Sequence, residues 1–488
     1  MSGVVGHSAD GNQHRIRALG DKADSYDNIS AEMPPPQSNL RLSIGALARS
    51  GAVAGAIKLA SAGLSFLMFV AVAMTTDGRQ FGLYSAAYAG ASLVSFFAVV
   101  GQQSAVLRFW PQYAGNNDLN SANGMMTRSI LVALAGLASF SLLILIIGIL
   151  PLAGTQTPEW FPICVATMVL AFALGWSEFV ACALRAKNAL IFALLPRDVL
   201  WRAVAIPVFV LAHFMQVKLS AVTATYLTAG LLLVMIAPQT FVLFRDTVRA
   251  QRGPLTIAQK AEFKTVTFGL WGVTALPPAL SQASTLLVAA ILGPEAAGAI
   301  FVADRTMRLV VLALNGINQA LAPQISAAFY TGDRAHVQRI TSLAALGGFV
   351  IALCVLISFL IFGDLILSIF NHAYATPTMQ VTLIIFGIGA TVGTACGPTE
   401  ILMQLTGLQH ALFKLLVIVN TFGLCATAVL TYWLGPIGAA LSIAGTIIIW
   451  CITAVFIARR TIGINPSILG FFAGEDALAA RSFLKGRS

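Results

Sequence analysis

Charged and amide side chains recur at helical spacing within one long apolar stretch of the sequence. Successive members lie four, seven and four residues apart, so one helical face would carry Asp304, Arg308, Asn315 and Gln319, with Arg305 beside them. A charge inside an apolar stretch costs at least a few kcal/mol unless it meets a partner, water or a ligand. Two interpretations stay open. Either this face lines a ligand-binding cavity, or Asp304 and Arg308 form an intrahelical ion pair while the amides hold neighbouring helices.

Another positive charge lies in the first apolar stretch of the chain. Lys58 shares a helical face with Ser61 and Ser65, about two turns into that stretch. Its long side chain could extend back to the polar interface, or its ammonium group could belong to a cavity. Lys58 is therefore a second candidate for ligand binding.

The next apolar stretch carries hydroxyl groups at helical spacing: Ser85, Tyr88, Ser92 and Ser95. Small hydroxyl residues in membrane helices usually make packing contacts, so we predict packing for this stripe. The stripe continues to Gln102, which we include among the cavity candidates.

Two glutamates occupy similar depths in the two halves of the chain. Glu178 and Glu400 each lie inside an apolar stretch. Together with Asp304 they are candidates for binding a coupling proton or Na⁺. The alternative for Glu178 is a structural ion pair with Arg185 or Arg202.

A pair of prolines interrupts a further apolar stretch near its middle. Pro277 and Pro278 each remove a backbone hydrogen bond, which kinks a helix. Breaks of this kind often line cavities in membrane proteins, so both prolines are candidate hinge residues.

The composition decides what kind of chain positions these residues. The 488 residues are 58% hydrophobic and 10% charged, whereas soluble domains are about 45–50% apolar and about 25% charged. A bilayer-crossing helix needs about 20 mostly apolar residues. We therefore predict an all-α polytopic membrane protein with twelve transmembrane helices, over residues 51–74, 81–106, 129–153, 161–184, 199–217, 221–244, 266–292, 298–321, 341–363, 380–403, 411–434 and 437–458.

The distribution of Lys and Arg predicts the orientation. With the N-terminus inside, 24 of the 29 Lys and Arg residues lie on the inner side, Arg202 being counted with an inner loop, and only Arg79 and Lys218 lie outside. The positive-inside rule then places both termini in the cytoplasm. The expected organisation is a disordered cytoplasmic tail (1–44), a six-helix bundle (45–244), a cytoplasmic linker (245–265), a second six-helix bundle (266–460) and a cytoplasmic tail (461–488).

The two halves show signs of an internal repeat. Gly82 and Gly298 are 216 residues apart, and Tyr113 and Tyr330 are 217 apart, each pair at matching ends of a span. Six spans per half give both halves the same orientation, which makes the repeat parallel. Two bundles around a central cavity is an arrangement typical of transporters.

Two segments also carry a family resemblance. Residues 81–113 have a Gly-Leu-Tyr entrance, a mid-helix glycine and a basic-aromatic exit, and residues 284–333 contain Leu292-Gly293-Pro294 and the exit Leu321-Ala322-Pro323. These segments resemble the polysaccharide transporter family of the multidrug/oligosaccharidyl-lipid/polysaccharide (MOP) superfamily. The resemblance covers roughly residues 45–460.

This resemblance implies a flippase of the bacterial inner membrane. It would move undecaprenyl-pyrophosphate-linked oligosaccharide by alternating access, for the biosynthesis of exopolysaccharide, capsule or the O-antigen of lipopolysaccharide. Its expected partners are that substrate, membrane lipids, and polysaccharide polymerase and export machinery. Lys58, Arg305 and Arg308 would meet the pyrophosphate.

Other functions fit the sequence less well. A cation-coupled multidrug or small-solute exporter of the same superfamily is the alternative, although its expected carboxylates are missing from the first two spans. A major-facilitator carrier would have an Asp-Arg-rich loop within residues 107–128, and a membrane glycan polymerase would have longer outer loops. The sequence contains no nucleotide-binding, esterase or metalloprotease motif and no metal-binding cysteine pattern, so we expect no enzyme, cofactor or metal. The scattered arginines argue against nucleic acid.

Overall fold

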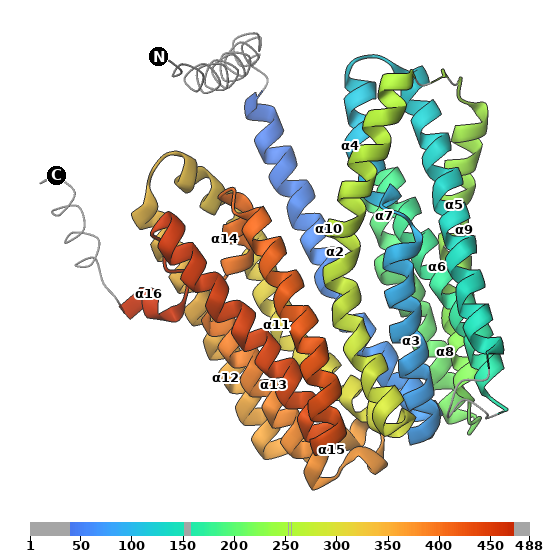
Figure 1. The fold of residues 1–488 in the computed structure, drawn as a ribbon, viewed down its shortest axis with the longest axis vertical. Coiled ribbons are helices and arrows are strands. Elements are labelled where there is room, and N and C mark those ends of the chain that lie inside the picture. The colour runs from blue at the N-terminus through green and yellow to red at the C-terminus, as the bar shows by residue number, and fades with distance from the viewer. Residues whose placement is uncertain (1–39, 151–157, 252, 255, 473–488) are drawn as a thin grey trace, which may run out of the picture. The chain divides into compact units, whose positions relative to one another are not determined.

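The computed structural model describes residues 40–150, 158–251, 253–254 and 256–472. The chain divides into two units, Met1–Gly51 and Ala52–Ser488, and the helix packing and the candidate site belong to the second unit. Every regular element in the described ranges is a helix (Figure 1). In order they are α2 (Leu40–Thr75), α3 (Gly78–Ala98), α4 (Gln102–Gly115), α5 (Leu119–Ile149), α6 (Trp160–Ala186), α7 (Leu190–Leu195), η1 (Pro196–Leu200), α8 (Trp201–Phe214), α9 (Ala221–Arg249), α10 (Ile257–Leu292), α11 (Pro294–Tyr330), α12 (Arg334–Phe370), η2 (His372–Tyr374), α13 (Pro377–Ala395), α14 (Thr399–Leu405), α15 (Gln409–Ile462) and α16 (Ile468–Phe472).

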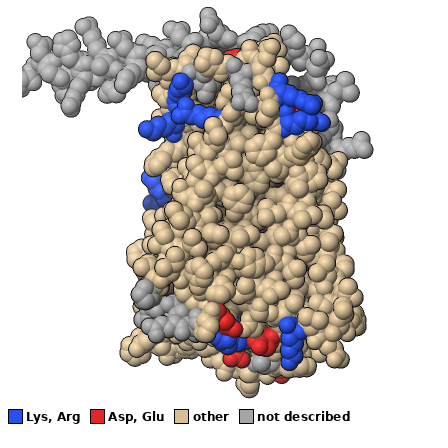
Figure 2. Space-filling model, turned by 90° about the vertical axis from the view of Figure 1, so that its right-hand side faces the viewer, with Lys and Arg blue, Asp and Glu red and all other residues tan. Residues whose placement is uncertain are grey.

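The helices have the length and surface of membrane spans. Within the described residues, eight are long and apolar enough to cross a bilayer, or nine if the bent α10 counts as one span. Charged side chains gather toward the two ends of the face in Figure 2, and the wide band between them is nearly uncharged. An apolar band of this kind matches the hydrocarbon core of a bilayer. The chain is an all-α polytopic membrane protein, and the count of twelve spans stays a prediction.

The fifth expected span differs from its prediction. The sequence predicts a helix over 199–217 with Arg202 beside an inner loop, whereas the helical path starts at Leu190 and continues through α7, η1 and α8 to Phe214. Pro196, Arg197 and Asp198 look like loop residues in sequence, yet they form η1, a π-helix. Arg197 and Arg202 therefore belong to a helix and not to a loop.

Helices from the same half of the sequence pack against one another. In the first half α6 packs against α5 and α9, and in the second half α13 packs against α12 and α15. Helix α3 connects the halves, because it packs against α6 and also against α10 and α11.

The two glycines that mark the repeat meet where α3 crosses α11. A Cβ atom added to Gly298 would lie 3.0 Å from the Cα of Gly82, and one added to Gly82 would overlap the carbonyl group of Pro294. Glycine allows helix backbones to approach this closely. The crossing therefore depends on the absence of side chains at both positions.

Two long helices are interrupted at proline. Helix α10 bends by 43° between its segments Gln259–Leu276 and Pro278–Leu292, at the predicted proline pair. The side chain of Pro277 lies outside the described residues. Helix α15 breaks at Gly435, which has a φ of 61° and precedes Pro436, and this break separates the last two expected spans.

Candidate functional site

A polar pocket of about 220 Å³ lies where both halves of the chain meet. Helices α3, α4, α6 and α8 and the η1 turn of the first half contribute side chains, and α10 and α11 contribute from the second half. Its lining residues are Tyr88, Ser92, Ser95, Phe96, Val99, Gln103, Leu174, Glu178, Arg197, Arg202, Gln282 and Arg305.

The first-half wall of the pocket contains a chain of ion pairs. Arg197 contacts the carboxylate of Glu178 on α6 and lies 3.2 Å from the carboxylate of its neighbour Asp198. The other oxygen of Asp198 lies 2.7 Å from the ammonium nitrogen of Lys58 on α2. These four residues neutralise one another, so neither Lys58 nor Arg197 is a free cation.

The second-half wall contains one more pair. Arg308 donates to the carboxylate of Asp304 one helical turn away at 2.7 Å, and to the hydroxyl of Ser281 on α10 at 3.1 Å. The ion pair of the intrahelical interpretation is therefore present, and the role of the amides in it stays a prediction. Neither residue lines the pocket itself.

Arg202 and Arg305 differ from the other cations of the pocket. Within the described residues neither forms an ion pair with a carboxylate. Arg202 donates to the carbonyl oxygen of Asp198 at 2.7 Å and to the hydroxyl of Ser61 at 3.3 Å. The guanidinium of Arg305 lies over the ring of Phe301, 4.5 Å from its centroid.

Each of these two arginines also has an unused donor. The Nε atoms of Arg202 and Arg305 are buried and have no hydrogen-bond partner among the described residues. A buried N–H without a partner costs about 1–3 kcal/mol. Because the two side chains come from different halves, an anion in the pocket would be held by both.

The charge of the lining favours an anion. Three arginines and one glutamate line the pocket, which gives an excess of two positive charges. A low-dielectric pocket strengthens the attraction between these charges and a ligand of opposite sign.

Several predicted site residues lie elsewhere. Gln102 is buried and donates to the carbonyl of Val100 at 3.3 Å, and its neighbour Gln103 faces the pocket instead. Glu400 is exposed and accepts a hydrogen bond from Gln404. The side chains of Asn315 and Gln319 lie outside the described residues.

The hydroxyl stripe of α3 is buried along its length, as packing requires. Ser85 bonds the carbonyl of Phe81, and the ring of Tyr88 meets that of Phe69 edge-on at 5.0 Å. Tyr88, Ser92 and Ser95 also border the pocket, so the role of packing alone stays a prediction. Their spacing places them on one face correctly, but it does not show that a wall of arginines lies opposite that face.

The sequence analysis named Arg202 only as a possible partner of Glu178, and it named Arg197 not at all, because their position around Pro196 is typical of a loop. The partner of Glu178 is Arg197 and neither Arg185 nor Arg202. The signal that could have found Arg197 and Arg202 is the apolar run Leu190–Leu195 directly before Pro196, which continues the helix at its N-terminal side. Proline is compatible with a helix where the carbonyl four residues earlier accepts from another donor.

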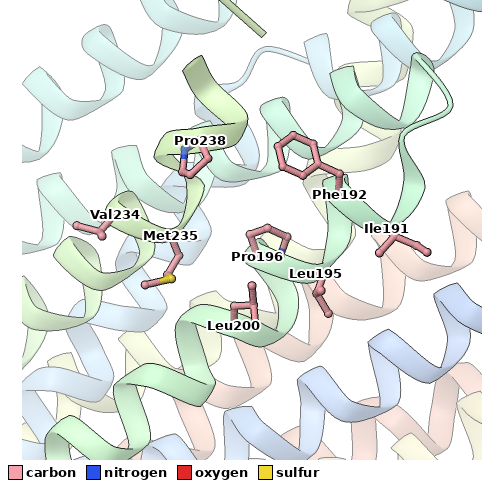
Figure 3. A pocket seen from close by; sticks show the side chains of 8 residues that line it. All are labelled: Ile191, Phe192, Leu195, Pro196, Leu200, Val234, Met235 and Pro238. Carbon is pink, nitrogen blue, oxygen red and sulfur yellow. The ribbon is translucent and has the colours of Figure 1, made fainter. Parts of the chain in front are cut away.

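Helix α7 and the turn η1 also border an apolar groove. Figure 3 shows this groove between α7–η1 and α9, with Pro196 and Pro238 on its two sides. Its volume is about 650 Å³, and all of its lining side chains are apolar: Ile191, Phe192, Leu195, Pro196, Leu200, Val234, Met235 and Pro238.

A second contact between the halves surrounds Tyr374. Its hydroxyl donates to the carbonyl of Gly78 at 2.8 Å, and the ring of Phe370 meets that of Phe66 edge-on at 5.3 Å. Burial, followed by the carboxylates of Glu295 and Asp77, raises the pKa of Tyr374, so its hydroxyl stays a donor. This contact and the glycine crossing both join the halves near the start of α3.

Comparison with known proteins identifies the fold. A solved MATE family transporter of the MOP superfamily in its inward-facing conformation superposes with a TM-score of 0.68 over 84% of this chain and 98% of that chain, at 14% identity. The chain has the fold of MATE transporters. A MATE protein in complex with MaL6 gives a TM-score of 0.59 at 18% identity, covering 85% of this chain and 96% of that chain. A third solved structure is a MOP superfamily transporter from Pyrococcus furiosus, described as having a binding pocket of reverse polarity that suggests a different function. It gives a TM-score of 0.58 at 17% identity, covering 85% of this chain and 95% of that chain. No family model and no curated protein matches the sequence.

Proposed function

We propose that this protein is a flippase for a lipid-linked oligosaccharide in the bacterial inner membrane. The observation that carries the proposal is the pocket between the halves, where the lining has an excess of two positive charges and where Arg202 and Arg305 lack carboxylate partners. A pyrophosphate carries about two negative charges near neutral pH, which would neutralise that excess. Its oxygens would accept from the two unused Nε donors.

The mechanism follows from the position of the pocket. Because one arginine comes from each half, a bound anion would bridge the halves and offset the cost of two buried positive charges. Alternating access would open the pocket to one side of the membrane at a time. The bend of α10 at Pro277 and Pro278 and the contact around Tyr374 are the elements that would change.

The other proposed roles follow from this mechanism. Glu178, paired with Arg197, would be the carboxylate at which a coupling proton or Na⁺ acts, because either would remove one of the two carboxylate partners of Arg197 at the pocket wall. Both termini would lie in the cytoplasm. Polysaccharide polymerase and export machinery would act on the product.

A cation-coupled multidrug exporter is the second candidate, because several solved structures of this fold are multidrug transporters by name. The charge of the pocket argues against it. A cationic drug would meet three arginines and one glutamate, and the glutamate already has a partner.

A proteoliposome assay tests the proposal. Purified protein is reconstituted with a fluorescent pyrophosphate-linked oligosaccharide lipid, and a membrane-impermeant quencher reports movement between leaflets. We expect movement with the natural sequence, and a loss of at least about tenfold with Arg305→Ala, since a hydrogen bond to a charged group contributes about 1.5–3 kcal/mol. Arg79→Ala is the matched control, because Arg79 pairs with Glu159 away from the pocket. Equal rates for Arg305→Ala and the natural sequence, or export of a cationic dye without lipid movement, would contradict the proposal.

A further inference from the structure

The π-helical turn η1 sets where the first-half arginines point. In an α-helix, residues five apart differ by about 140° around the axis, so Arg197 and Arg202 would face different directions. A π-turn closes with a hydrogen bond between residues five apart, here from the N–H of Trp201 to the carbonyl of Pro196. Residues five apart then lie near one face, and Arg202 reaches back to the carbonyl of Arg197 at 3.3 Å. The wide turn therefore brings both arginines to the same pocket wall.

The proline that opens the wide turn leaves one backbone carbonyl without its usual partner. In an α-helix the carbonyl of Phe192 would accept from the N–H of residue 196, but Pro196 has no N–H. The groove on that side offers only apolar side chains. A carbonyl among apolar side chains needs a donor from elsewhere, because an unpaired one costs free energy.

Gln239 of α9 supplies that donor. Its side chain is fully buried, and its amide nitrogen donates to the carbonyl of Phe192 and, at 3.0 Å, to the carbonyl of Ala193. It therefore holds the segment directly before η1 from the neighbouring helix. Gln239 does not line the pocket, so any effect on ligand binding would act through the turn.

We infer that Gln239 is the positioning residue of the anion site: by bonding the carbonyls of Phe192 and Ala193 it keeps η1 wide and thereby keeps Arg197 and Arg202 on one pocket wall. The assignment of an anion site rests on the proposed function. The mechanical part, that Gln239 holds the wide turn, rests on the hydrogen bonds alone.

The test separates these two parts. The full chain is placed in lipid nanodiscs, binding of inorganic pyrophosphate is measured by calorimetry, and hydrogen exchange is followed in the segment 190–204. Gln239→Met keeps the length of the side chain and removes the donor. Val234→Ala is the matched control on the same helix, because Val234 is exposed in the groove and bonds no carbonyl through its side chain.

In the Gln239→Met variant we expect the backbone amide hydrogens of residues 190–204 to exchange faster. We also expect this variant to bind pyrophosphate about tenfold more weakly, as two lost hydrogen bonds would predict. Val234→Ala should change neither quantity. If Gln239→Met lowers the melting temperature but binds pyrophosphate normally, Gln239 is merely structural and the inference is wrong. If Gln239→Met does not fold, Gln239→Asn, whose amide is one methylene too short to reach both carbonyls, is expected to show a smaller loss of the same kind.

Failure of the proposed function gives a different result. In that case the natural protein would not bind pyrophosphate, and hydrogen exchange would decide the mechanical part. Unchanged exchange in Gln239→Met would then overturn it, and faster exchange in 190–204 with no change elsewhere would support it.

Discussion

At the residue scale, the partner of each basic side chain matters more than the number of basic side chains. Lys58, Arg197 and Arg308 each lie within 4 Å of a carboxylate. Arg202 and Arg305 bond or stack on neutral groups. A guanidinium that is kept partly buried without a carboxylate is costly, which is why these two arginines are the best candidates for binding an anionic ligand.

The geometry of Arg305 leads to the first prediction. Its planar group stacks on Phe301 and presents Nε, so a phosphate would be held by several fixed N–H groups. Arg305→Lys keeps the charge but loses that arrangement. We expect lipid movement in proteoliposomes to fall by about tenfold for Arg305→Lys, compared with near-complete loss for Arg305→Ala. Full activity of the lysine variant would mean that charge alone is required.

Arg308 and Asp304 lead to a prediction about stability. Arg308→Ala would leave Asp304 mostly buried without its ion pair, and we expect it to destabilise the protein by about 1–3 kcal/mol, less than a fully buried pair because the Arg308 side chain is 41% exposed. Thermal unfolding in detergent measures the loss. The double variant Arg308→Ala/Asp304→Asn should recover most of it, because the orphaned charge is gone. Lack of recovery would mean that Arg308 acts beyond the pair.

At the element scale, the crossing of α3 and α11 leads to the third prediction. Gly82→Ala would push a methyl group into the carbonyl of Pro294, so the closed contact between the halves should open more often. Ala297 is fully buried next to the crossing, so a cysteine at this position (Ala297→Cys), in a background without other cysteines, reports whether the contact opens. We expect a membrane-impermeant maleimide to label it at least about tenfold faster when Gly82→Ala is added, a ratio that corresponds to about 1.4 kcal/mol.

The control for that experiment is another glycine-to-alanine change. Gly230 on α9 has no atom within 4 Å of an added Cβ, so Gly230→Ala should leave the labelling rate unchanged. Equal labelling rates with and without Gly82→Ala would show that the crossing tolerates a side chain.

Some of the elements could be predicted from the sequence and others could not. Apolar stretches of about 20 residues predict membrane helices well, because the bilayer leaves few alternatives. The break of α15 at Gly435-Pro436 and the bend of α10 at its proline pair follow from the residues themselves. The π-turn at Pro196 could not be predicted, because its stability depends on a donor from Gln239, 43 residues later in the sequence. Arg305 could be predicted as a site residue because the apolar stretch around it is itself a helix. Arg197 and Arg202 could not, because the π-turn that positions them depends on a residue distant in the sequence.

At the scale of the whole molecule, the turns between helices indicate sidedness. The N–H of Leu219 donates to the carbonyl of Thr75 at 2.8 Å, Arg79 lies 2.9 Å from Glu159, and Tyr374 donates to Gly78. The starts of α3 and α6 and the turns directly before α9 and α13 therefore meet at one end of the unit. Arg79, at the start of α3, and Lys218, in the turn before α9, are the two outer basic residues of the prediction.

This arrangement sharpens the topology prediction. Moving Arg197 and Arg202 from an inner loop into a helix leaves 22 basic residues inside against two outside, so the charge asymmetry persists. We expect an alkaline phosphatase reporter to be inactive when fused after Ser488 and active when inserted after Lys218, because the enzyme folds only outside the cytoplasm. A cytoplasm-dependent fluorescent reporter at the same two sites is the control and should give the opposite pattern. Phosphatase activity at Ser488 would mean that the number of spans is odd, and the flippase proposal would then need a different arrangement of its two halves.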